Sequence, residues 1–521
     1  MHRSNKWQNI TVITMVLIVV VLSVIINIQY KKEGLSKIAE TINIDNGDQS
    51  INWERYPTFE ITLDEAMDII QPGTYHITGT LEDAGISINA GGGEVRIILD
   101  NTTINNSNGP AIACYSAEDL VIELVGENSL SDGPAYASNY DEDVNGVIYS
   151  KADLTFDGDG SLTLQANYQD GIVGKDDLKF VGGLYNIVSA DDGIRGKDSV
   201  YILDGSFIID ATSDAIKATN DTTTGKGFIL VEDGNFDLVA SGKGLQSTSS
   251  ILIYGGNYII NTKDDAVHSD SYLGIKDGQF NINSGDDGLH ANKELTIDGG
   301  EITVVMSYEG MEAQVVTINE GIINLVSQDD GINAGGGADS SATMRQGAGV
   351  FDADENCKLT INGGEIAINA SGDGIDSNGW LYFNGGTVVV DGPTNNGNGA
   401  LDSGMGIVMN GGEVLAVGAS GMASTLGMAS SIFNVSIYTT STQAANTRIV
   451  IKDSSGKEVF SHQAKKTFDH IAAGSPMFEL GETYTVYFDD INYQNFTISG
   501  VTTTVGSNKS NNSQFGPQRR K

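Results

Sequence analysis

Acidic residues recur in this sequence at a spacing that can build a cation site. Each precedes a small residue and then an apolar one, and the interval from Asp192 to Asp214 equals the interval from Asp265 to Asp287. A carboxylate at constant spacing indicates a position that every structural repeat presents once. Several repeats place a second acid directly before the first, as in Asp191/Asp192, Asp264/Asp265, Asp286/Asp287 and Asp329/Asp330.

The chemistry predicted for this series is calcium binding. If each repeat is one coil of a solenoid, equivalent residues of successive coils lie about 4.8 Å apart. Carboxylates at that distance repel each other by roughly 1 kcal/mol in water, and by several times that value at a partly buried site. Calcium takes about six to eight oxygen ligands. The competing interpretation is that Asp-Gly merely forms a corner turn. The predicted metal ligands are Asp191, Asp192, Asp214, Asp264, Asp265, Asp286, Asp287, Asp329 and Asp330.

A second polar series follows three residues after the acids and alternates with apolar residues. Because alternate side chains of a strand lie on opposite faces, this series predicts a flat outward face. Such a face suits a linear polymer, although an ordinary solvated wall has the same pattern. Two histidines one coil apart can also bind a transition metal, which the lack of a third histidine disfavours. The predicted ligand-binding residues are Arg195, Lys197, Lys217, His268 and His290.

The repeat that carries both series predicts three short strands in each coil. A glycine stands nine residues before most of the acids, as Gly205 does before Asp214, and the apolar pair Phe207 and Ile209 follows that glycine at period two. Alternation at period two with glycine at corners is typical of strands. One coil cannot bury its apolar face alone, so coils must stack. We predict an all-β chain: a right-handed parallel β-helix solenoid of about 22-residue coils with a small C-terminal β unit.

The ends of the chain differ from this repeat. The run Ile10–Ile28 is uncharged and long enough to span a bilayer. No small-residue cleavage motif follows it, which favours a retained anchor with the body outside the cell. A body without further spans is expected to be monomeric. The predicted segments are an N-terminal signal anchor (1–30), a linker (31–60), the β-helix (61–429), the small β unit (430–504) and a disordered polar tail (505–521).

Composition limits the partners. With 68 acidic and 29 basic residues the net charge is −39, which repels phosphate backbones and excludes nucleic acid. The cysteines Cys114 and Cys357 lie outside any CxxC motif, which excludes a disulfide framework and a thiolate zinc site. Trp53 and Trp380 are far apart in sequence, so the coplanar aromatics that suit crystalline cellulose are not evident. Acidic or soluble glycans fit better.

Several runs resemble the carbohydrate-binding domain family of clostridial surface β-helix proteins, over about residues 60–430. Members of that family are shaped like pectate lyases and bind cellulose and acidic plant polysaccharides without established cleavage. The resemblance implies calcium near the first doubled acids, with Arg195, Lys197 and Lys217 facing an acidic sugar. Ala215 stands where the family pattern usually has glycine. The runs are Asn128–Asp132 (NSLSD), Ile148–Gly160 (IYSKADLTFDGDG), Asp170–Leu178 (DGIVGKDDL), Asp191–Asp198 (DDGIRGKD) and Asp214–Asn220 (DAIKATN).

Three functional classes fit these patterns. The favoured one is a non-catalytic, calcium-binding protein of the cell surface that binds acidic plant polysaccharides such as polygalacturonate, with cellulose as a further ligand. The alternative is a calcium-dependent, pectate-type polysaccharide lyase in which Lys217 or Arg195 removes the C5 proton of a uronate. A structural adhesin is the third. Because the neighbouring acids are expected to keep Lys217 protonated, binding is favoured over cleavage.

Overall fold

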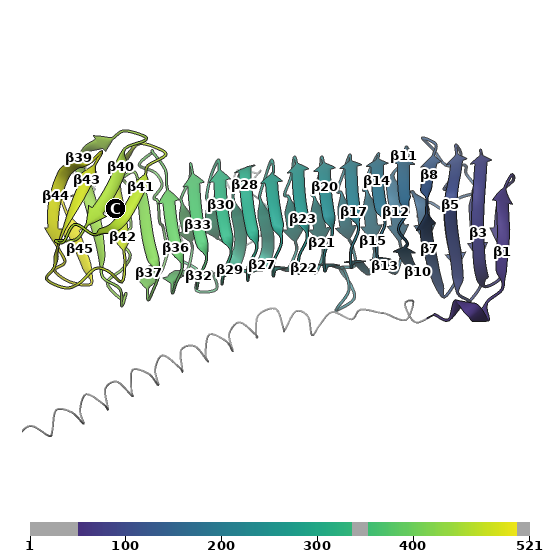
Figure 1. The fold of residues 1–521 in the computed structure, drawn as a ribbon, viewed down its shortest axis with the longest axis horizontal. Coiled ribbons are helices and arrows are strands. Elements are labelled where there is room, and N and C mark those ends of the chain that lie inside the picture. Colours follow the sequence, from purple (N-terminus) through teal and green to yellow (C-terminus); the bar gives the residue numbers. More distant parts are fainter. Residues whose placement is uncertain (1–50, 336–352, 508–521) are drawn as a thin grey trace, which may run out of the picture. The chain divides into compact units, whose positions relative to one another are not determined.

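The structure is a computed structural model that describes residues 51–335 and 353–507 (Figure 1). Within these ranges, 41 strands belong to one continuous sheet and four to a second sheet. Most strands of the first sheet wind into a β-solenoid of about 15 turns. The predicted all-β fold, a right-handed parallel β-helix, is confirmed.

Each regular coil contributes one strand to each of three walls. The coil of β16 (Ser199–Ile202), β17 (Ser206–Ala211) and β18 (Ile216–Ala218) pairs with the preceding one through parallel strands only. The register is continuous, so Ile194 lies opposite Ile216 and Arg195 opposite Lys217. Successive coils therefore hold equivalent residues in vertical rows.

Three walls of parallel strands run along the solenoid. One wall, in which most strands have only three residues, is the narrow sheet. It contains β2 (Met67–Ile69), β4 (Ile86–Asn89), β6 (Ile112–Ser116), β9 (Gly146–Ser150), β12 (Asp170–Gly174), β15 (Ile194–Gly196), β18, β21 (Leu245–Ser247), β24 (Val267–Ser269), the start of β27 (Leu289–Ile297), the start of β29 (Met311–Ile318), β31 (Ile332–Ala334) and β34 (Ile375–Ser377). The second wall contains β7 (Asp119–Val125), β10 (Asp153–Asp157), β13 (Asp177–Phe180), β16, β19 (Phe228–Val231), β22 (Ser250–Ile253), β25 (Tyr272–Ile275), β32 (Lys358–Ile361), β35 (Trp380–Phe383) and β37 (Gly406–Met409). The third contains β8 (Glu127–Asp132), β11 (Ser161–Ala166), β14 (Leu184–Ser189), β17, β20 (Asn235–Ala240), β23 (Asn257–Thr262), β26 (Gln279–Asn283), β28 (Glu301–Ser307), β30 (Ile322–Ser327), β33 (Glu365–Ala370), β36 (Thr387–Asp391) and β38 (Glu413–Gly418). The N-terminal coils begin with a 3-10 turn at Trp53–Arg55, β1 (Thr58–Leu63), β3 (Gly73–Glu82) and β5 (Val95–Asn106).

The core follows from alternation along these strands. In β17, Phe207 and Ile209 point inward and are buried, whereas Ile208 between them is exposed. The corner before this strand needs glycine, because Gly205 has φ of +140°, which L-residues rarely adopt. The inward aromatic rings stack from coil to coil at centroid distances of 4.4 to 5.2 Å, in the order Tyr185, Phe207, Phe236, Tyr258 and Phe280.

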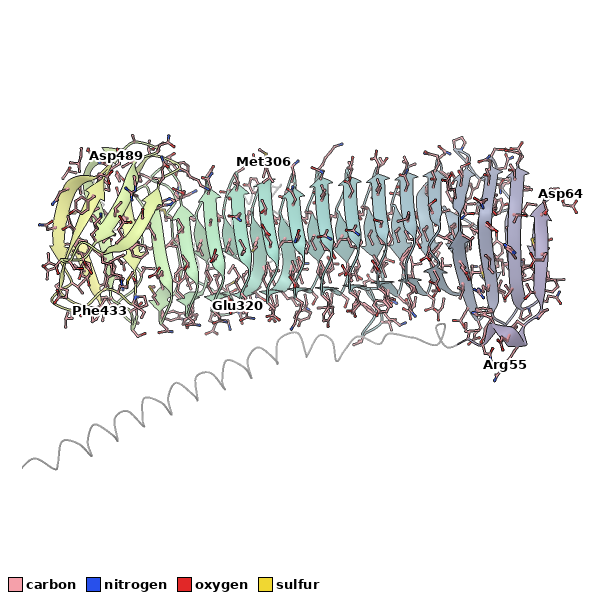
Figure 2. The ribbon with its side chains drawn as sticks, in the orientation of Figure 1. Arg55, Asp64, Met306, Glu320, Phe433 and Asp489 are labelled. Atoms are coloured by element: carbon pink, nitrogen blue, oxygen red, sulfur yellow. The ribbon has the colours of Figure 1, made fainter. Side chains whose placement is uncertain are left out.

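The solenoid ends where an antiparallel strand pairs with β38. That strand is β42 (Phe468–Gly474), which also pairs with β39 (Asn434–Gln443); β39 in turn pairs with β45 (Thr502–Val505). The four-stranded sheet consists of β41 (Glu458–Gln463), β40 (Arg448–Lys452), β43 (Thr483–Phe488) and β44 (Ile491–Thr497). Side chains from these elements surround a second apolar core that includes Val486 and Phe496, and Phe433, labelled in Figure 2, packs against it. This is the small C-terminal β unit.

The predicted anchor Ile10–Ile28 and most of the predicted polar tail lie outside the described residues. In the parts of the chain that the structure does describe, no helix combines the length and the apolar character that a membrane crossing requires.

Candidate functional site

The narrow sheet positions both polar series of the sequence. The acids stand at the corner just before its strands, and the second series occupies the outward position at the middle of each strand. We call the corner acids the acid ladder and the outward positions the outer row. The acid ladder comprises Asp170, Asp192, Asp214, Asp265, Asp287, Glu309, Asp330 and Asp373, with Lys243 in the acid's place in one coil. The outer row runs through Val173, Arg195, Lys217, Gln246, His268, His290, Glu312, Asn333, Asp376 and Asp402.

Carboxylates of the acid ladder bind the backbone of the following coil. The Asp214 N–H donates to Asp192 Oδ1 at 3.1 Å, and the Lys243 N–H donates to Asp214 Oδ1 at 2.7 Å. One carboxylate oxygen of such an acid is therefore used to hold two coils together. The same contact joins Asp192 to Asp170, Asp287 to Asp265, and Asp373 to Asp330.

In the coils from Asp170 to Asp265, basic side chains occupy the other carboxylate oxygen. Lys217 Nζ lies 2.6 Å from Asp214 Oδ2 and 3.8 Å from Asp192 Oδ2. Arg195 makes an ion pair with Asp170. Lys243 Nζ lies 2.7 Å from Asp265 Oδ2 and 2.8 Å from Asp264 Oδ1. Two predicted ligand-binding residues, Arg195 and Lys217, are thus bound to acids of the ladder.

The remaining predicted site residues divide by exposure. Lys197 is exposed just beyond β15, and the first acid of each doubled pair, such as Asp191, Asp264, Asp286 and Asp329, is half-buried. His268 and His290 lie in the outer row but are 3 % and 0 % exposed. Each imidazole fills the gap between a ladder carboxylate and a polar side chain two residues further on. His268 Nδ1 lies 2.7 Å from Asp265 Oδ2, and its ring stacks on that of His290 at 4.6 Å.

From Glu309 to Asp402, neither the ladder nor the outer row contains a basic residue among the residues described. Burial, with the charge of neighbouring acids, raises the pKa of Asp330 to about 9 and that of Asp376 to about 6. Burial also raises the pKa of Asp373 to about 7. Asp330 therefore holds a proton at neutral pH unless a cation replaces it, whereas Asp373 is partly protonated and Asp376 is mostly ionised.

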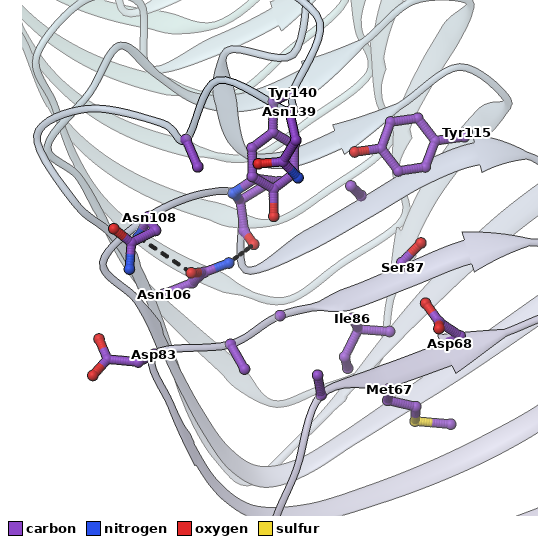
Figure 3. A pocket seen from close by; sticks show the side chains of 16 residues that line it. Met67, Asp68, Asp83, Ile86, Ser87, Asn106, Asn108, Tyr115, Asn139 and Tyr140 are labelled. Atoms are coloured by element: carbon purple, nitrogen blue, oxygen red, sulfur yellow. Dashed lines mark hydrogen bonds between the residues drawn. The ribbon is translucent and has the colours of Figure 1, made fainter.

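The narrow sheet ends, at its N-terminal side, in a pocket that the sequence patterns did not predict (Figure 3). The cavity measures about 620 Å³ and is lined by Tyr115 from β6, Tyr140 from the loop after β8, and polar groups that include Asp68, Ser87 and Asn108. The sequence contains one indication of this pocket, the long insertion between β8 and β9 (residues 133–145), which supplies Tyr136 and Tyr140.

The insertion is held in place by hydrogen bonds and ring contacts. Tyr136 Oη lies 2.9 Å both from Asp132 Oδ2 and from the Gly146 carbonyl oxygen. Its ring lies 5.7 Å from that of Tyr140, centroid to centroid. Tyr140 therefore belongs to a packed cluster of tyrosines, although it lies in a loop.

Comparisons with known proteins agree with the predicted resemblance. A family model described as "Carbohydrate-binding domain-containing protein" matches residues 63–310. A relative of the same description from Acetivibrio thermocellus is 38 % identical over 120 residues. That match spans 22 % of this chain and 42 % of the relative, less than half of the relative's length.

A solved structure is also similar, described as the polysaccharide lyase-like protein from C. thermocellum in a gadolinium derivative. It is 29 % identical, covers 42 % of this chain and 96 % of that chain, and gives a TM-score of 0.39. The family match alone confirms the predicted resemblance to the carbohydrate-binding domain family, over slightly less than half of the chain. The residues that the family model matches, 63–310, include those that line the pocket described above, which we call the tyrosine pocket. They also include Arg195 and Lys217, the basic residues of the outer row.

Proposed function

We propose that this chain binds polysaccharide without cleaving it, and that the tyrosine pocket with the adjoining outer row forms the binding surface. The observation that carries the proposal is the lining of the pocket. The rings of Tyr115 and Tyr140 offer apolar faces for the C–H face of a sugar, and Asn108, Ser87 and Asp68 offer hydrogen bonds to hydroxyl groups. The family match supports a carbohydrate partner.

Basic side chains beside the pocket favour an acidic glycan. Lys175 Nζ lies 5.6 Å above the ring of Tyr149, and Lys197 is exposed in the next coil. Arg195 and Lys217 are partly exposed although each is paired with an acid. In a chain of net charge −39, a basic cluster on one wall is a specific feature. The anchor predicted at Ile10–Ile28 would display this surface outside the cell, a proposal that rests on the sequence.

Calcium fits one part of the acid ladder better than the other. Around Asp192 and Asp214, one carboxylate oxygen accepts a backbone N–H and the other faces Lys217, so these acids do not suit a calcium ion. Around Asp330 and Asp376, no base of the described ladder or outer row competes, and carboxyl groups with raised pKa values lie close together. We therefore place the predicted calcium on the ladder beyond Glu309, where oxygen ligands suit a hard cation.

A lyase is the second candidate, and its base would differ from the predicted one. Burial lowers the pKa of Lys217, but its hydrogen bond to Asp214 and the charge of Asp192 outweigh burial and raise the pKa. Lys217 therefore stays protonated. Burial and the charge of Arg195 lower the pKa of Lys175, which makes it the better base on this surface.

The test compares binding and cleavage of polygalacturonate by the purified full chain. Binding is measured by calorimetry, and cleavage by the absorbance of unsaturated products. We expect binding without product, and a roughly 2- to 12-fold loss of affinity in Tyr140→Ala, the range for one aromatic contact. Tyr201→Ala, on the second wall, is the matched control and should bind normally. Product formation that Lys175→Met abolishes would establish the lyase instead, and equal affinity in Tyr140→Ala would remove the pocket from the site.

A further inference from the structure

Two successive coils contain the same short motif in different surroundings. The first runs from Asp264 to His268 and the second from Asp286 to His290, each with a doubled acid three residues before the histidine. In the first coil Lys243 contacts Asp265, and the pKa of that carboxyl is lowered, because the hydrogen bond from His268 and the Lys243 charge outweigh burial. The second coil has no such lysine.

In the second coil, three donor groups converge. His290 Nδ1 lies 2.8 Å from Asp287 Oδ2 and 3.4 Å from Glu312 Oε2. Asp287 and His290 belong to one coil, and Glu312 stands opposite His290 in the next. All three side chains are buried, and their donor atoms lie within 4.8 Å of one another.

The backbone contact of the acid ladder is missing at this point. Asn283 pairs with Met306, whereas Leu289 pairs with Met311, so the two pairings are out of step with each other. The corner that contains Glu309 is therefore one residue shorter than the corner below it. As a result Asp287 Oδ1 is buried without any hydrogen-bond partner. Met306, labelled in Figure 2, marks this irregular coil.

One ring nitrogen of His290 is engaged outside the cluster. His290 Nε2 lies 3.0 Å from Asn292 Oδ1, the geometry of an N–H that donates to the amide oxygen. The other ring nitrogen, Nδ1, faces the carboxylates of Asp287 and Glu312. A metal-binding histidine typically donates its other N–H in this way to a neighbouring oxygen.

We propose that Asp287, His290 and Glu312 bind a divalent transition-metal ion, and that zinc is its occupant. One imidazole nitrogen and two carboxylate oxygens are a donor set for zinc, at metal–ligand distances of about 2.0 to 2.2 Å. The two carboxylates balance its charge, and Asp287 Oδ1 supplies a further oxygen. The imidazole disfavours calcium at this point. Asp287 and His290 belong to one coil and Glu312 to the next, so the ion would join these two coils. It would do so at the point where the backbone contact of Asp287 Oδ1 is absent.

The test uses the purified full chain, unfolded and refolded with Co²⁺ or Zn²⁺, freed of excess metal and analysed by elemental mass spectrometry. Visible absorption of Co²⁺ reports its coordination. We expect about one tightly bound ion per chain, not displaced by millimolar calcium. Glu312→Gln and Asp287→Asn should each weaken the affinity by at least about 10- to 100-fold, because loss of a direct ligand should cost no less than loss of a residue that only orients one. His268→Gln is the matched control and should keep the ion, since Lys243 already serves its carboxylate.

Two results would overturn the proposal. One is a refolded wild-type chain, with a native circular dichroism spectrum, that retains no Co²⁺ and lacks its absorption bands. The other is His268→Gln losing the ion as completely as Glu312→Gln, because the site would then not depend on this coil. The wild-type measurement decides the matter even if a variant fails to fold. It is independent of saccharide binding, so its failure would leave the proposed function untouched.

Discussion

Between Asp170 and Asp265 the acid ladder is accompanied by Arg195, Lys217 and Lys243, whereas between Glu309 and Asp402 the described ladder and outer row contain only acids and one asparagine. Both regions use equivalent strands of the narrow sheet and the same corner, and the carboxylate-to-backbone contact occurs in both, at Asp192 as at Asp330. They differ in what neutralises the second carboxylate oxygen. The repeated acidic step therefore serves to stack coils, and the presence of a basic residue in the outer row or in the ladder itself decides whether the carboxylates need an external cation.

The largest effect should come from removing a built-in cation. In Lys243→Gln, the fully buried Asp265 keeps only His268 as a partner for its outer oxygen. Breaking a buried pair by removing one partner costs about 3 to 5 kcal/mol, measured here by urea denaturation. Lys276→Gln, whose exposed side chain pairs with Asp298, is the control and should change stability by less than about 0.5 kcal/mol. Equal losses in both would mean that Lys243 does not neutralise the ladder.

The second largest effect is expected from calcium, which should depend on the acidic region of the ladder and not on the basic one. A ligand that binds only the folded chain stabilises it by about 2.7 kcal/mol at a concentration of 100 Kd. We expect calcium to raise the melting temperature at pH 8 in zinc-free buffer, and Asp330→Asn to abolish most of that response. Asp192→Asn should retain it, because Lys217 already lies beside Asp192. A response lost in Asp192→Asn and kept in Asp330→Asn would move the ion to the basic region.

Stability without metal should fall as the pH rises. Burial raises the pKa of Asp330 from its usual 3.8 to about 9, so above pH 4 the folded chain keeps a proton that the unfolded chain loses. The unfolding free energy therefore decreases between about pH 4 and pH 9, by up to about 2.7 kcal/mol between pH 6 and pH 8 for this one proton. Chemical denaturation in chelator at the two pH values measures this. Asp330→Asn should reduce the slope, while Asp373 and Asp376, whose pKa values are also raised, keep a smaller one; an unchanged slope would contradict the assignment.

The smallest effect is expected for a cation that is partly exposed. Lys217→Met should lower the unfolding free energy by about 0.5 to 1 kcal/mol, because solvent screens its pair with Asp214. Lys197→Met replaces an exposed lysine and should leave stability within about 0.5 kcal/mol of the wild type. If the two variants lose equal stability in thermal denaturation, the ion pair of Lys217 does not contribute to the ladder.

The sequence predicted the fold because the fold depends on local pattern. The glycine at Gly205 and the alternation of Phe207 and Ile209 recur every coil, and either one alone identifies a corner or a strand. The positions of the acids were equally evident. Their partners were not, because a contact from Asp192 Oδ1 to the Asp214 N–H exists only once the coils are stacked.

Neither the pocket nor the burial of the two histidines was predicted from the sequence, and the reasons are related. Tyr115 and Tyr140 are distant in the sequence, and one of them belongs to an insertion that has no equivalent in the repeat. His268 and His290 were expected on an open face, since alternation shows which side of a strand a residue occupies but not what covers that side. Burial of a polar residue depends on neighbours from other coils, which no single repeat contains.

The ladders also have a direction. In each backbone contact of the acid ladder the earlier coil supplies the acceptor and the later coil the donor, and the side-chain amides of Asn362, Asn384 and Asn410 each donate to the coil before them in the same sense. A solenoid that folds from its N-terminal coil would therefore present, in most coils, carboxylate acceptors to the coil that follows. We expect the same carboxylates, while they are still hydrated, to repel other partly folded chains and to disfavour association through the growing end.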